Sequence, residues 1–273
     1  MRFLSQNILG SYNTQSTITS SSGDPYNAFS DTTKFPFISS GQDSDGDTVE
    51  INQTNTSKQS LDTIVVLASN FNDFKISTSA TSGGAFSDIT GTATLVISQD
   101  GFHRLYKFPS TINFFDIKFQ IDDTIIADEE KQCGAILGMT ELGSIDRFKA
   151  IKPKGKDAKV VNKLEAGGVS VLYKGSIHWD FEIDIDLLSS QVDVDLIELI
   201  GSRQQDFFLW INDDHDGEET VKQAPYRFQD FIRCVYTGDS SPQFYKNYLN
   251  KSASGNKFKF AQTGKINYFN PTL

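Results

Sequence analysis

The chain has 273 residues, of which 38% are hydrophobic, and its formal net charge is −10. This length suits two domains of ordinary size, and 22 Phe and 9 Tyr residues are too many for a disordered chain. The negative charge argues against direct nucleic-acid binding, because that binding depends on Lys and Arg side chains that neutralise phosphates.

The cysteines and the amino-terminal residues bear on the cellular compartment in which the chain folds. Cys133 and Cys234 lie far apart in the sequence, which predicts buried free thiols and not a disulfide framework. The first residues lack the apolar segment of a signal peptide. The longest apolar run, residues 64–68, is too short to span a membrane. We therefore expect folding in a reducing cytoplasm, without membrane insertion.

Residues 24–41 read DPYNAFSDTTKFPFISSG and contain four aromatic rings whose spacing is neither helical nor alternating. The composition is otherwise that of a loop, which raises the question of what the rings do. We expect the loop to cap one end of a β-sandwich and to be held there by its own aromatic side chains.

Six short segments rich in β-branched and aromatic residues follow, separated by polar turn clusters. They span residues 48–52, 63–69, 74–80, 92–98, 103–109 and 114–122, and a closing strand is expected at 131–139. In the sixth segment, Phe115, Ile117, Phe119 and Ile121 alternate with polar residues, a pattern typical of a half-buried strand. No helical period separates the segments, so they predict an antiparallel β-sandwich, which we assign to residues 1–147.

A lysine-rich joint near residues 144–157 precedes a different pattern. Residues 179–186 alternate strictly between apolar and acidic side chains, as expected for a strand. The acidic positions are Asp180, Glu182, Asp184 and Asp186. Four like charges on one strand repel each other, so we expect Lys or Arg beside them, on a neighbouring strand or on another subunit.

A helical period then appears, with Val192, Leu196, Leu199 and Ile200 on one face. Gly201 supplies a stop signal, so we expect a helix over about residues 190–202. Two more strands are expected within residues 206–212 and 226–238. The fold class is therefore mainly β, with a second β-sandwich over residues 148–273 flanked by one α-helix.

Three aspartates form the clearest candidate metal site. Asp43, Asp45 and Asp47 alternate around a glycine in the sequence DSDGD, a spacing that lets carboxylate oxygens converge on Ca²⁺. The alternative is a solvated turn, because Asp and Gly are common turn residues. The acidic turn at residues 212–219 has the same two interpretations. No other cofactor is expected.

Catalytic motifs are absent from the sequence, which contains no G-x-S-x-G, phosphate-binding loop or H-E-x-x-H pattern. Only three histidines occur, and two of them lie in expected strands. We therefore expect a protein that is not an enzyme. The remaining enzymatic hypothesis uses His215 with Asp213 and Asp216.

The aromatic loop and the strands after it resemble the start of galactose-binding-like, discoidin-type jelly rolls. In that family an Asn-Ala-Phe-Asp stretch and an aromatic-Ser motif precede a strand. The matching positions are Asn27, Ala28, Phe29, Asp31, Phe37 and Ser39. The family's usual Trp is absent, and Phe35 and Phe37 stand nearest to it. The resemblance covers about residues 8–145 and implies a jelly roll of a kind that often binds glycans, but it carries over no ligand residues.

The second half is similar in pattern to tail-tube and distal-tail proteins of tailed phages and gene transfer agents. The similarity lies in the order of strand, helix, the FFLWIN strand and the long YRFQDFIRCVYTG strand. It implies a structural subunit of a tail tip or baseplate that forms homo-oligomeric rings and contacts other tail proteins. Such a subunit is part of a virion assembled in the host cytoplasm, and its jelly roll is expected to meet cell-surface glycans. The alternative hypothesis is a carbohydrate-binding adhesin module.

Overall fold

The structure is a computed structural model of the chain, and it divides into two units that are described separately. Residues 5–141 form one unit, and the described parts of residues 1–4 and 142–265 form the other. The structure describes residues 2–10, 16–30, 35–97, 101–144, 150–156, 159–163, 169–173, 178–185, 195–196, 199–200, 206–210, 231–237 and 256–262.

This division differs from the predicted domains, 1–147 and 148–273, at the start of the chain. Strand β1 (Arg2–Leu4) pairs antiparallel with β16 (Phe207–Trp210), and β11 (Glu141–Ser144) lies on its other side. The first strand therefore belongs to the carboxy-terminal sheet. A local sequence pattern carries no information about such a distant partner, because backbone pairing is the same for every residue type.

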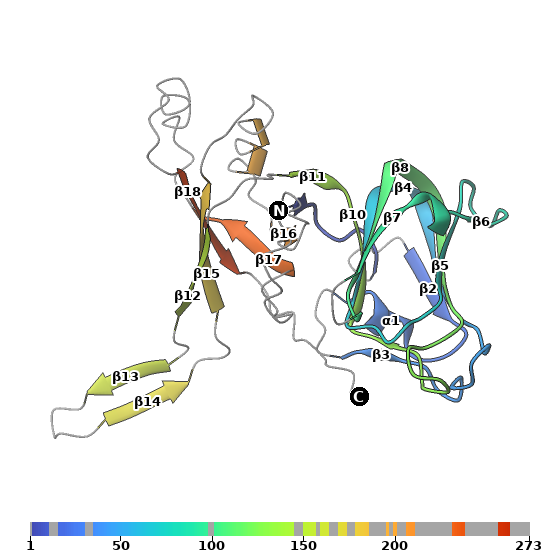
Figure 1. Cartoon of the computed structure of the whole chain (residues 1–273), viewed down its shortest axis with the longest axis horizontal. Coiled ribbons are helices and arrows are strands. Elements are labelled where there is room, and N and C mark those ends of the chain that lie inside the picture. Colours follow the sequence, from blue (N-terminus) through green and yellow to red (C-terminus); the bar gives the residue numbers. More distant parts are fainter. Residues whose placement is uncertain are drawn as a thin grey trace. The chain divides into compact units, whose positions relative to one another are not determined.

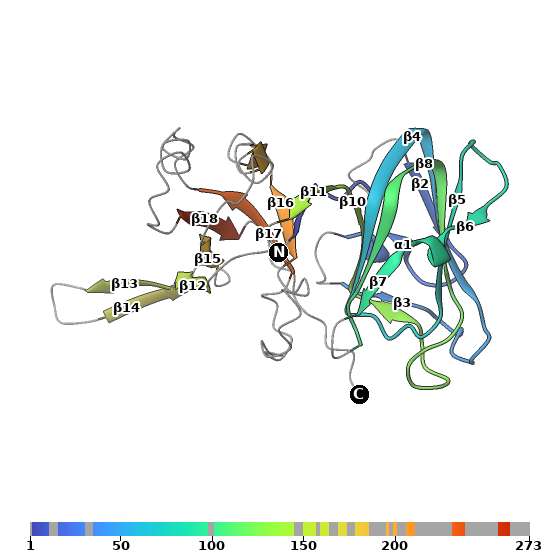
Figure 2. The ribbon, with the colours of Figure 1, turned by 45° about the horizontal axis from the view of Figure 1, so that its top comes forward.

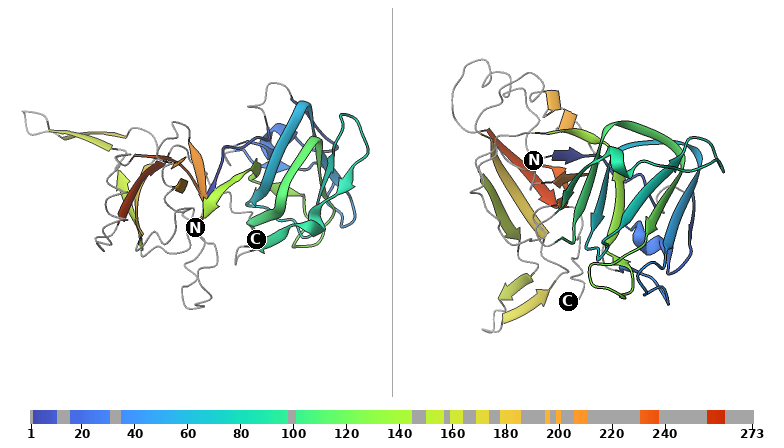
Figure 3. Two further views of the ribbon diagram at one scale, coloured as in Figure 1. Left: turned by 90° about the horizontal axis from the view of Figure 1, so that it is seen from above. Right: turned by 45° about the vertical axis from the view of Figure 1, so that its right-hand side comes forward.

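Two long strands, β4 (Val49–Leu67) and β8 (Arg104–Ile121), organise the jelly roll. Their paired register is interrupted between Thr54 and Gln59, where the sheet folds over on itself. One half of the pair joins β2 (Ser16–Ser20) and β5 (Phe74–Ser79), and the other half joins β10 (Ala135–Met139) and β7 (Thr94–Ile97). The result is two facing layers, visible in Figure 1 and from above in Figure 3.

Shorter elements complete this unit, and every strand pairing described within it is antiparallel. They are β2 (Ser16–Ser20), α1 (Pro25–Ala28), β3 (Phe37–Ile38), β5 (Phe74–Ser79), β6 (Ser87–Asp88), the 3₁₀ turn η1 (Thr90–Thr92), β7 (Thr94–Ile97), β9 (Gln132–Cys133) and β10 (Ala135–Met139). The mainly β class and the antiparallel sandwich are therefore confirmed.

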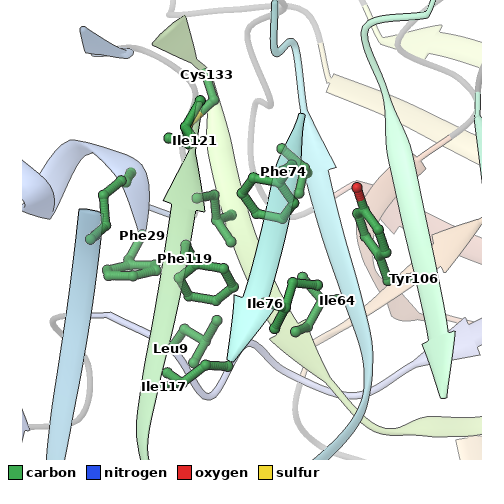
Figure 4. Close-up of a cluster of buried hydrophobic side chains, with 14 of the residues drawn as sticks. Leu9, Phe29, Ile64, Phe74, Ile76, Tyr106, Ile117, Phe119, Ile121 and Cys133 are labelled. Atoms are coloured by element: carbon green, nitrogen blue, oxygen red, sulfur yellow. The ribbon is translucent and has the colours of Figure 1, made fainter. Parts of the chain in front are cut away.

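The core of the jelly roll lies between the two layers and is rich in phenylalanine (Figure 4). The Phe74 ring of one layer lies 5.6 Å from the Tyr106 ring of the other. Ile117, Phe119 and Ile121 are buried as the alternation predicts, but Phe114 is buried in place of Phe115. The alternation shifts there because the strand crosses the irregularity at the fold of the sheet.

The aromatic loop fills the end of the sandwich with two of its four rings. Phe29 and Phe37 are fully buried, and the Phe29 ring lies 5.7 Å from that of Phe119 (Figure 4). Asp24 caps α1 by accepting a hydrogen bond from the backbone N–H of Tyr26 at 3.0 Å. The expectation that the loop is held by its aromatics is confirmed for these two rings only. Tyr26 and Phe35 are exposed.

The second unit contains a seven-stranded sheet in the order β11-β1-β16-β17-β18-β15-β12. Its remaining strands are β12 (Ala150–Lys156), β15 (His178–Ile185), β17 (Phe231–Tyr236) and β18 (Asn256–Gln262). Strands β13 (Lys159–Lys163) and β14 (Val169–Tyr173) form a separate two-stranded sheet, drawn in Figure 2.

The strand register places lysines opposite acidic residues of β15, as expected from the sequence. Glu182 lies opposite Lys152 of β12 and Lys259 of β18, and Asp184 lies opposite Lys257. The positive charges that the sequence requires are therefore available within the same sheet.

Of the helix expected over about residues 190–202, the structure describes only residues 195–196 and 199–200, and these four are helical. Leu196 and Ile200 are buried, whereas Leu199 is exposed, so the buried face is narrower than the sequence pattern suggests. Val192 lies outside the described residues. Leu196 packs on Gly143, where a Cβ atom would come within 2.8 Å of the leucine side chain.

Both cysteines are free and buried, as predicted. Burial raises the pKa of both thiols, so they are protonated and unreactive at neutral pH. Within the described part of the chain, no helix is long and apolar enough to cross a membrane.

Candidate functional site

One end of the jelly roll is built from loops that hydrogen-bond to one another. We call it the open end, because β4 and β10 begin and β8 finishes there. The backbone N–H of Ser40 donates to Ser22 Oγ at 2.7 Å, and that of Ser39 donates to the Lys131 carbonyl at 2.9 Å. These bonds join the turn after β2, the segment after β3 and the loop before β9. Loops tied in this way hold their side chains in a defined arrangement.

Several of the loops at this end carry exposed apolar side chains. Of the nine large hydrophobic residues exposed in the described part of the chain, five lie on α1, on β3 and its lead-in, or on the loop after β8. These five, which we call the open-end patch, are Tyr26, Phe35, Ile38, Ile125 and Ile126. Tyr26 is 54% exposed and Phe35 is 61% exposed. Exposed apolar side chains that gather in one region mark interaction sites more often than scattered ones do.

The loop that carries Asp43, Asp45 and Asp47 is anchored to the loop after β8. The Asp45 N–H donates to Asp128 Oδ1 at 3.1 Å, and the Asp128 N–H donates to Asp45 Oδ1 at 3.4 Å. The Gly46 N–H donates to Asp123 Oδ1 at 3.1 Å. The carboxylates of this region therefore act as acceptors for backbone groups.

Lys131 places a positive charge close to the same loop. Its side chain is fully buried, and its ammonium donates to the carbonyl of Ser44 at 2.8 Å. Among the described residues, no group of three or more His, Cys, Asp or Glu side chains is arranged to hold a metal ion. The calcium site at Asp43, Asp45 and Asp47 thus stays a prediction, and Lys131 is a second source of positive charge for the loop.

A hydrogen-bonded carboxylate stands beside this loop at the end of β8. Asp122 accepts hydrogen bonds from Lys75 Nζ at 2.6 Å and from Thr48 Oγ1 at 2.7 Å. Partial burial acts to raise the pKa of Asp122, but the hydrogen bonds from Lys75, Thr48 and Gln120 outweigh it and the pKa is lowered. The same contact raises the pKa of Lys75. This pair fixes the start of β4 and β5 relative to β8.

The only histidine with a described side-chain contact has a structural role. His103 Nδ1 accepts a hydrogen bond from the N–H of Ala68 at 3.1 Å, and Ala68 has a positive φ of 47°. His103 thereby supports a strained turn. His215, Asp213 and Asp216, together with the acidic turn at 212–219, lie outside the described residues.

Sequence reasoning missed Lys131, Ile125 and Ile126. The two isoleucines follow a strand in an unpatterned segment, and a period-based reading treats such a segment as a simple turn. Lys131 lies next to two acidic residues and resembles a solvated surface lysine. Its burial is visible only once the loops are placed.

No protein-family model matches the chain, and no curated protein matches it. Among solved structures, it is similar to CBM32-3 from a family 31 glycoside hydrolase of Clostridium perfringens, with 16% identity and a TM-score of 0.37, over 46% of this chain and 92% of that one. It is also similar to a mutant of chitosan-binding module 1 from a chitosanase/glucanase of Paenibacillus sp. IK-5, with 14% identity and a TM-score of 0.38, over 50% and 98% of the two chains.

A third similar structure is the family 32 carbohydrate-binding module of C. perfringens NanJ in complex with galactose. It shares 9% identity, with a TM-score of 0.37, over 51% of this chain and 99% of that one. Likenesses at this level of identity and TM-score carry no argument about the ligand of this protein.

Proposed function

We propose that the jelly roll is a non-enzymatic module that binds glycans at its open end. The observation that carries this proposal is the pair of exposed rings, Tyr26 and Phe35, on loops that are hydrogen-bonded into the fold. An aromatic ring offers a flat apolar surface for the C–H face of a pyranose, and few polar groups beside it are needed to orient the sugar. Ring-bearing loops on a rigid sandwich are well suited to recognition.

Two further features support the same function. The loops around the patch are rich in Ser, Thr, Asn and Asp, whose side chains exchange hydrogen bonds with hydroxyl groups. The sequence resemblance to galactose-binding-like jelly rolls covers the same segment, from Asn27 to Ser39. His103 is engaged with the backbone of Ala68, which fits a structural role for this histidine.

A glycan array followed by calorimetric titration tests this function. We expect the intact chain to bind at least one glycan, and a variant with Tyr26→Ala and Phe35→Ala to bind it at least about tenfold more weakly, since stacked rings contribute more than 1 kcal/mol. Leu95→Ala is the matched control, because Leu95 is also exposed but lies on β7. Equal affinity of the double variant and the control would overturn the assignment. An array without any bound glycan would overturn the function itself.

A second candidate is a structural subunit of a phage-like tail tip or baseplate, within a virion assembled in the host cytoplasm. The β13–β14 hairpin favours it. In the described part of the chain these two five-residue strands pair only with each other (Figure 2). An isolated two-stranded hairpin is marginally stable in water, so it gains order by packing on a partner. In a ring, that partner is a neighbouring copy of the chain or another tail protein.

Electron microscopy and light scattering of the purified chain test the second candidate. We expect rings, and we expect replacement of residues 157–176 by a short Gly-Ser linker to reduce the oligomer to monomers. A chain that remains strictly monomeric at high concentration would contradict the assembly role. Glycan binding and assembly are compatible in one virion protein.

A further inference from the structure

One layer of the jelly roll contains β2, β5 and the halves of β4 and β8 that pair with them. The outer face of this layer, which points away from the core, carries a polar surface away from the open end. Ile117 and Phe119 of β8 are buried in the core, so Asp116 and Lys118, which alternate with them, belong to the opposite, outer face. The register places Asn52 of β4 directly opposite Lys118, and Thr54 opposite Asp116. Asn52 and Asp116 are therefore diagonal neighbours on this face.

Asp116 is buried although it belongs to the outer face. Only 2% of its surface is exposed, and the N–H of Gly83 donates to its Oδ2 atom at 2.7 Å. Gly83 belongs to the loop between β5 and β6, residues 80–86, which therefore lies over the carboxylate. This loop reads ATSGGAF, and Gly83 has a φ of +67°. It is composed of small residues and includes two adjacent glycines, a composition that gives a loop high conformational freedom.

Two buried acceptor atoms beneath and beside this loop have no donor. Neither Asp116 Oδ1 nor Asn52 Oδ1 accepts a hydrogen bond from any described residue. A buried acceptor without a donor destabilises the fold, and more so when it is charged. Native structures rarely leave two such atoms next to each other without a role. Water or the hydroxyl groups of a bound ligand would supply the donors that this pair lacks among the described residues.

An aromatic ring and a neutralised charge pair border the same acceptors. Phe86, at the end of the covering loop, is 40% exposed, and Lys118 Nζ lies 5.2 Å from the centre of its ring. The same ammonium contacts Glu50 Oε1 at 2.9 Å. The charge of Lys118 is thus already balanced. We call Glu50, Asn52, Phe86, Asp116 and Lys118 the outer-face site.

We propose that the outer-face site is a second binding site of the jelly roll, for a neutral pyranose sugar. The proposal rests on the glycan-binding function given above but assigns it a different location. Sugar hydroxyls donate to Asn52 Oδ1 and Asp116 Oδ1, and the apolar face of the sugar packs on Phe86. The loop of residues 80–86 moves outward to admit the sugar, and the Gly83 contact with Asp116 re-forms or is replaced by a hydroxyl.

The chemistry of the site selects against charged ligands. An anionic sugar would approach two carboxylates, those of Glu50 and Asp116, while the one ammonium is already paired. A bound metal ion is not indicated, because the described residues contain no cluster of three suitable ligands. Donor-rich neutral ligands are the class that satisfies both orphan oxygens.

Nuclear magnetic resonance of the isotope-labelled full chain, titrated with D-galactose, tests the proposal. We expect saturable shifts of the amide signals of Gly83, Phe86 and Lys118. Glycerol at equal hydroxyl concentration is the control, since it offers hydroxyls but no ring face, and we expect it to produce no saturable shift. The parallel readout is the amide signals of Tyr26, Ile38 and Ile125, which report on the open-end patch.

Asp116→Asn is the decisive variant, because it keeps an acceptor for Gly83 and replaces the second oxygen with a donor. We expect at least about a tenfold loss of galactose affinity at the outer face, with the same unfolding temperature. Asp195→Asn, at an exposed aspartate of the other unit, is the matched control. Phe86→Ala tests the same site through an exposed side chain, and it decides the matter if Asp116→Asn does not fold.

The outcomes separate this inference from the proposed function. Saturable shifts confined to the open-end residues would uphold the glycan-binding function and overturn the outer-face site. Shifts at the outer face that Asp116→Asn or Phe86→Ala abolishes would support the site, whatever happens at the open end. The absence of any saturable shift with galactose, together with a glycan array without hits, would overturn both.

Discussion

The ammonium of Lys131 donates a 2.8 Å hydrogen bond to the backbone carbonyl of Ser44, inside the loop that carries Asp43, Asp45 and Asp47. A fully buried lysine is rare and costly unless its charge is compensated. The three aspartates lie within three residues of Ser44, so the loop that accepts this hydrogen bond also carries negative charge. The loop and the lysine are therefore interdependent, and this relationship bears directly on whether the loop requires calcium.

We predict that calcium does not raise the thermal stability of the chain, because Lys131 supplies the positive charge that the aspartate loop needs. The measurement is a thermal unfolding curve in 5 mM EDTA and in ~5 mM Ca²⁺. A site occupied at 100 times its dissociation constant would add about 2.7 kcal/mol. A clear rise of the unfolding temperature with Ca²⁺, abolished by Asp45→Asn, would instead establish the calcium site expected from the sequence.

We predict a large difference between two aromatic residues three positions apart. Phe29→Ala should destabilise the chain by about 3–5 kcal/mol, because it removes a fully buried ring in contact with Phe119. Tyr26→Ala should change the free energy of unfolding by less than about 0.5 kcal/mol, since Tyr26 is exposed. Urea unfolding measures both values. Similar losses for the two variants would contradict the assignment of the rings to core and surface.

We predict acid destabilisation that depends on Asp122. The pKa of Asp122 is lower in the folded chain than in the unfolded chain. Its contribution to the free energy of unfolding is therefore fully present above the unfolded-state pKa and is lost as the pH falls through the folded-state pKa. In Asp122→Asn this part of the pH dependence should be absent. Unfolding temperatures measured between about pH 2 and pH 7 test the difference between the two slopes.

Lys75, the partner of Asp122, gives a further prediction for the loss of stability at alkaline pH. The hydrogen bond to Asp122 raises the pKa of Lys75 in the folded chain. The contribution of Lys75 to the free energy of unfolding is therefore fully present below the unfolded-state pKa and is lost as the pH rises through the folded-state pKa. Lys75→Met should therefore reduce the alkaline loss of stability. Parallel acid slopes in the parent chain and in Asp122→Asn would show that the Asp122–Lys75 contact contributes nothing.

We predict that Gly143→Ala destabilises the second unit by about 1–3 kcal/mol. A Cβ atom at this position would lie 2.8 Å from the Leu196 side chain, and the backbone has a φ of +152°. Adding Leu196→Ala to Gly143→Ala should relieve the clash, which gives a favourable interaction energy in a double-mutant cycle. Hydrogen exchange of β1 and β11 is the local measurement. Strict additivity of the two substitutions would show that the residues do not touch.

The sequence predicted those parts of the fold that depend on local period. Alternation at Ile117, Phe119 and Ile121 identified a half-buried strand, and all three are buried. The helical period identified the turns that contain Leu196 and Ile200. The position of Phe114 could not be predicted, because an irregularity in strand pairing shifts the alternation without changing the residue types.

The candidate sites were less predictable than the fold. The rings of residues 24–41 pointed to the open end, but the sequence did not separate buried Phe29 and Phe37 from exposed Tyr26 and Phe35. Nothing in the local sequence distinguishes these four rings, since each lies in a polar, turn-like context. Which ring is buried depends on contacts with β8, a strand far away in the chain.

The outer-face site could not be predicted from the local sequence either. Asp116 is an ordinary polar residue of an alternating strand by sequence, and only the loop of residues 80–86 buries it.

The sequence by itself determined the mainly β class, the free buried cysteines and the need for positive charge beside the acidic strand. Each of these follows from composition or from a period that repeats within a few residues. Only the tertiary structure decided that β1 pairs with β16, that Lys131 is buried near the aspartate loop and that two acceptors meet on the outer face. The physical reason is that backbone pairing and burial depend on which distant segments meet, and the local pattern of side chains does not specify that.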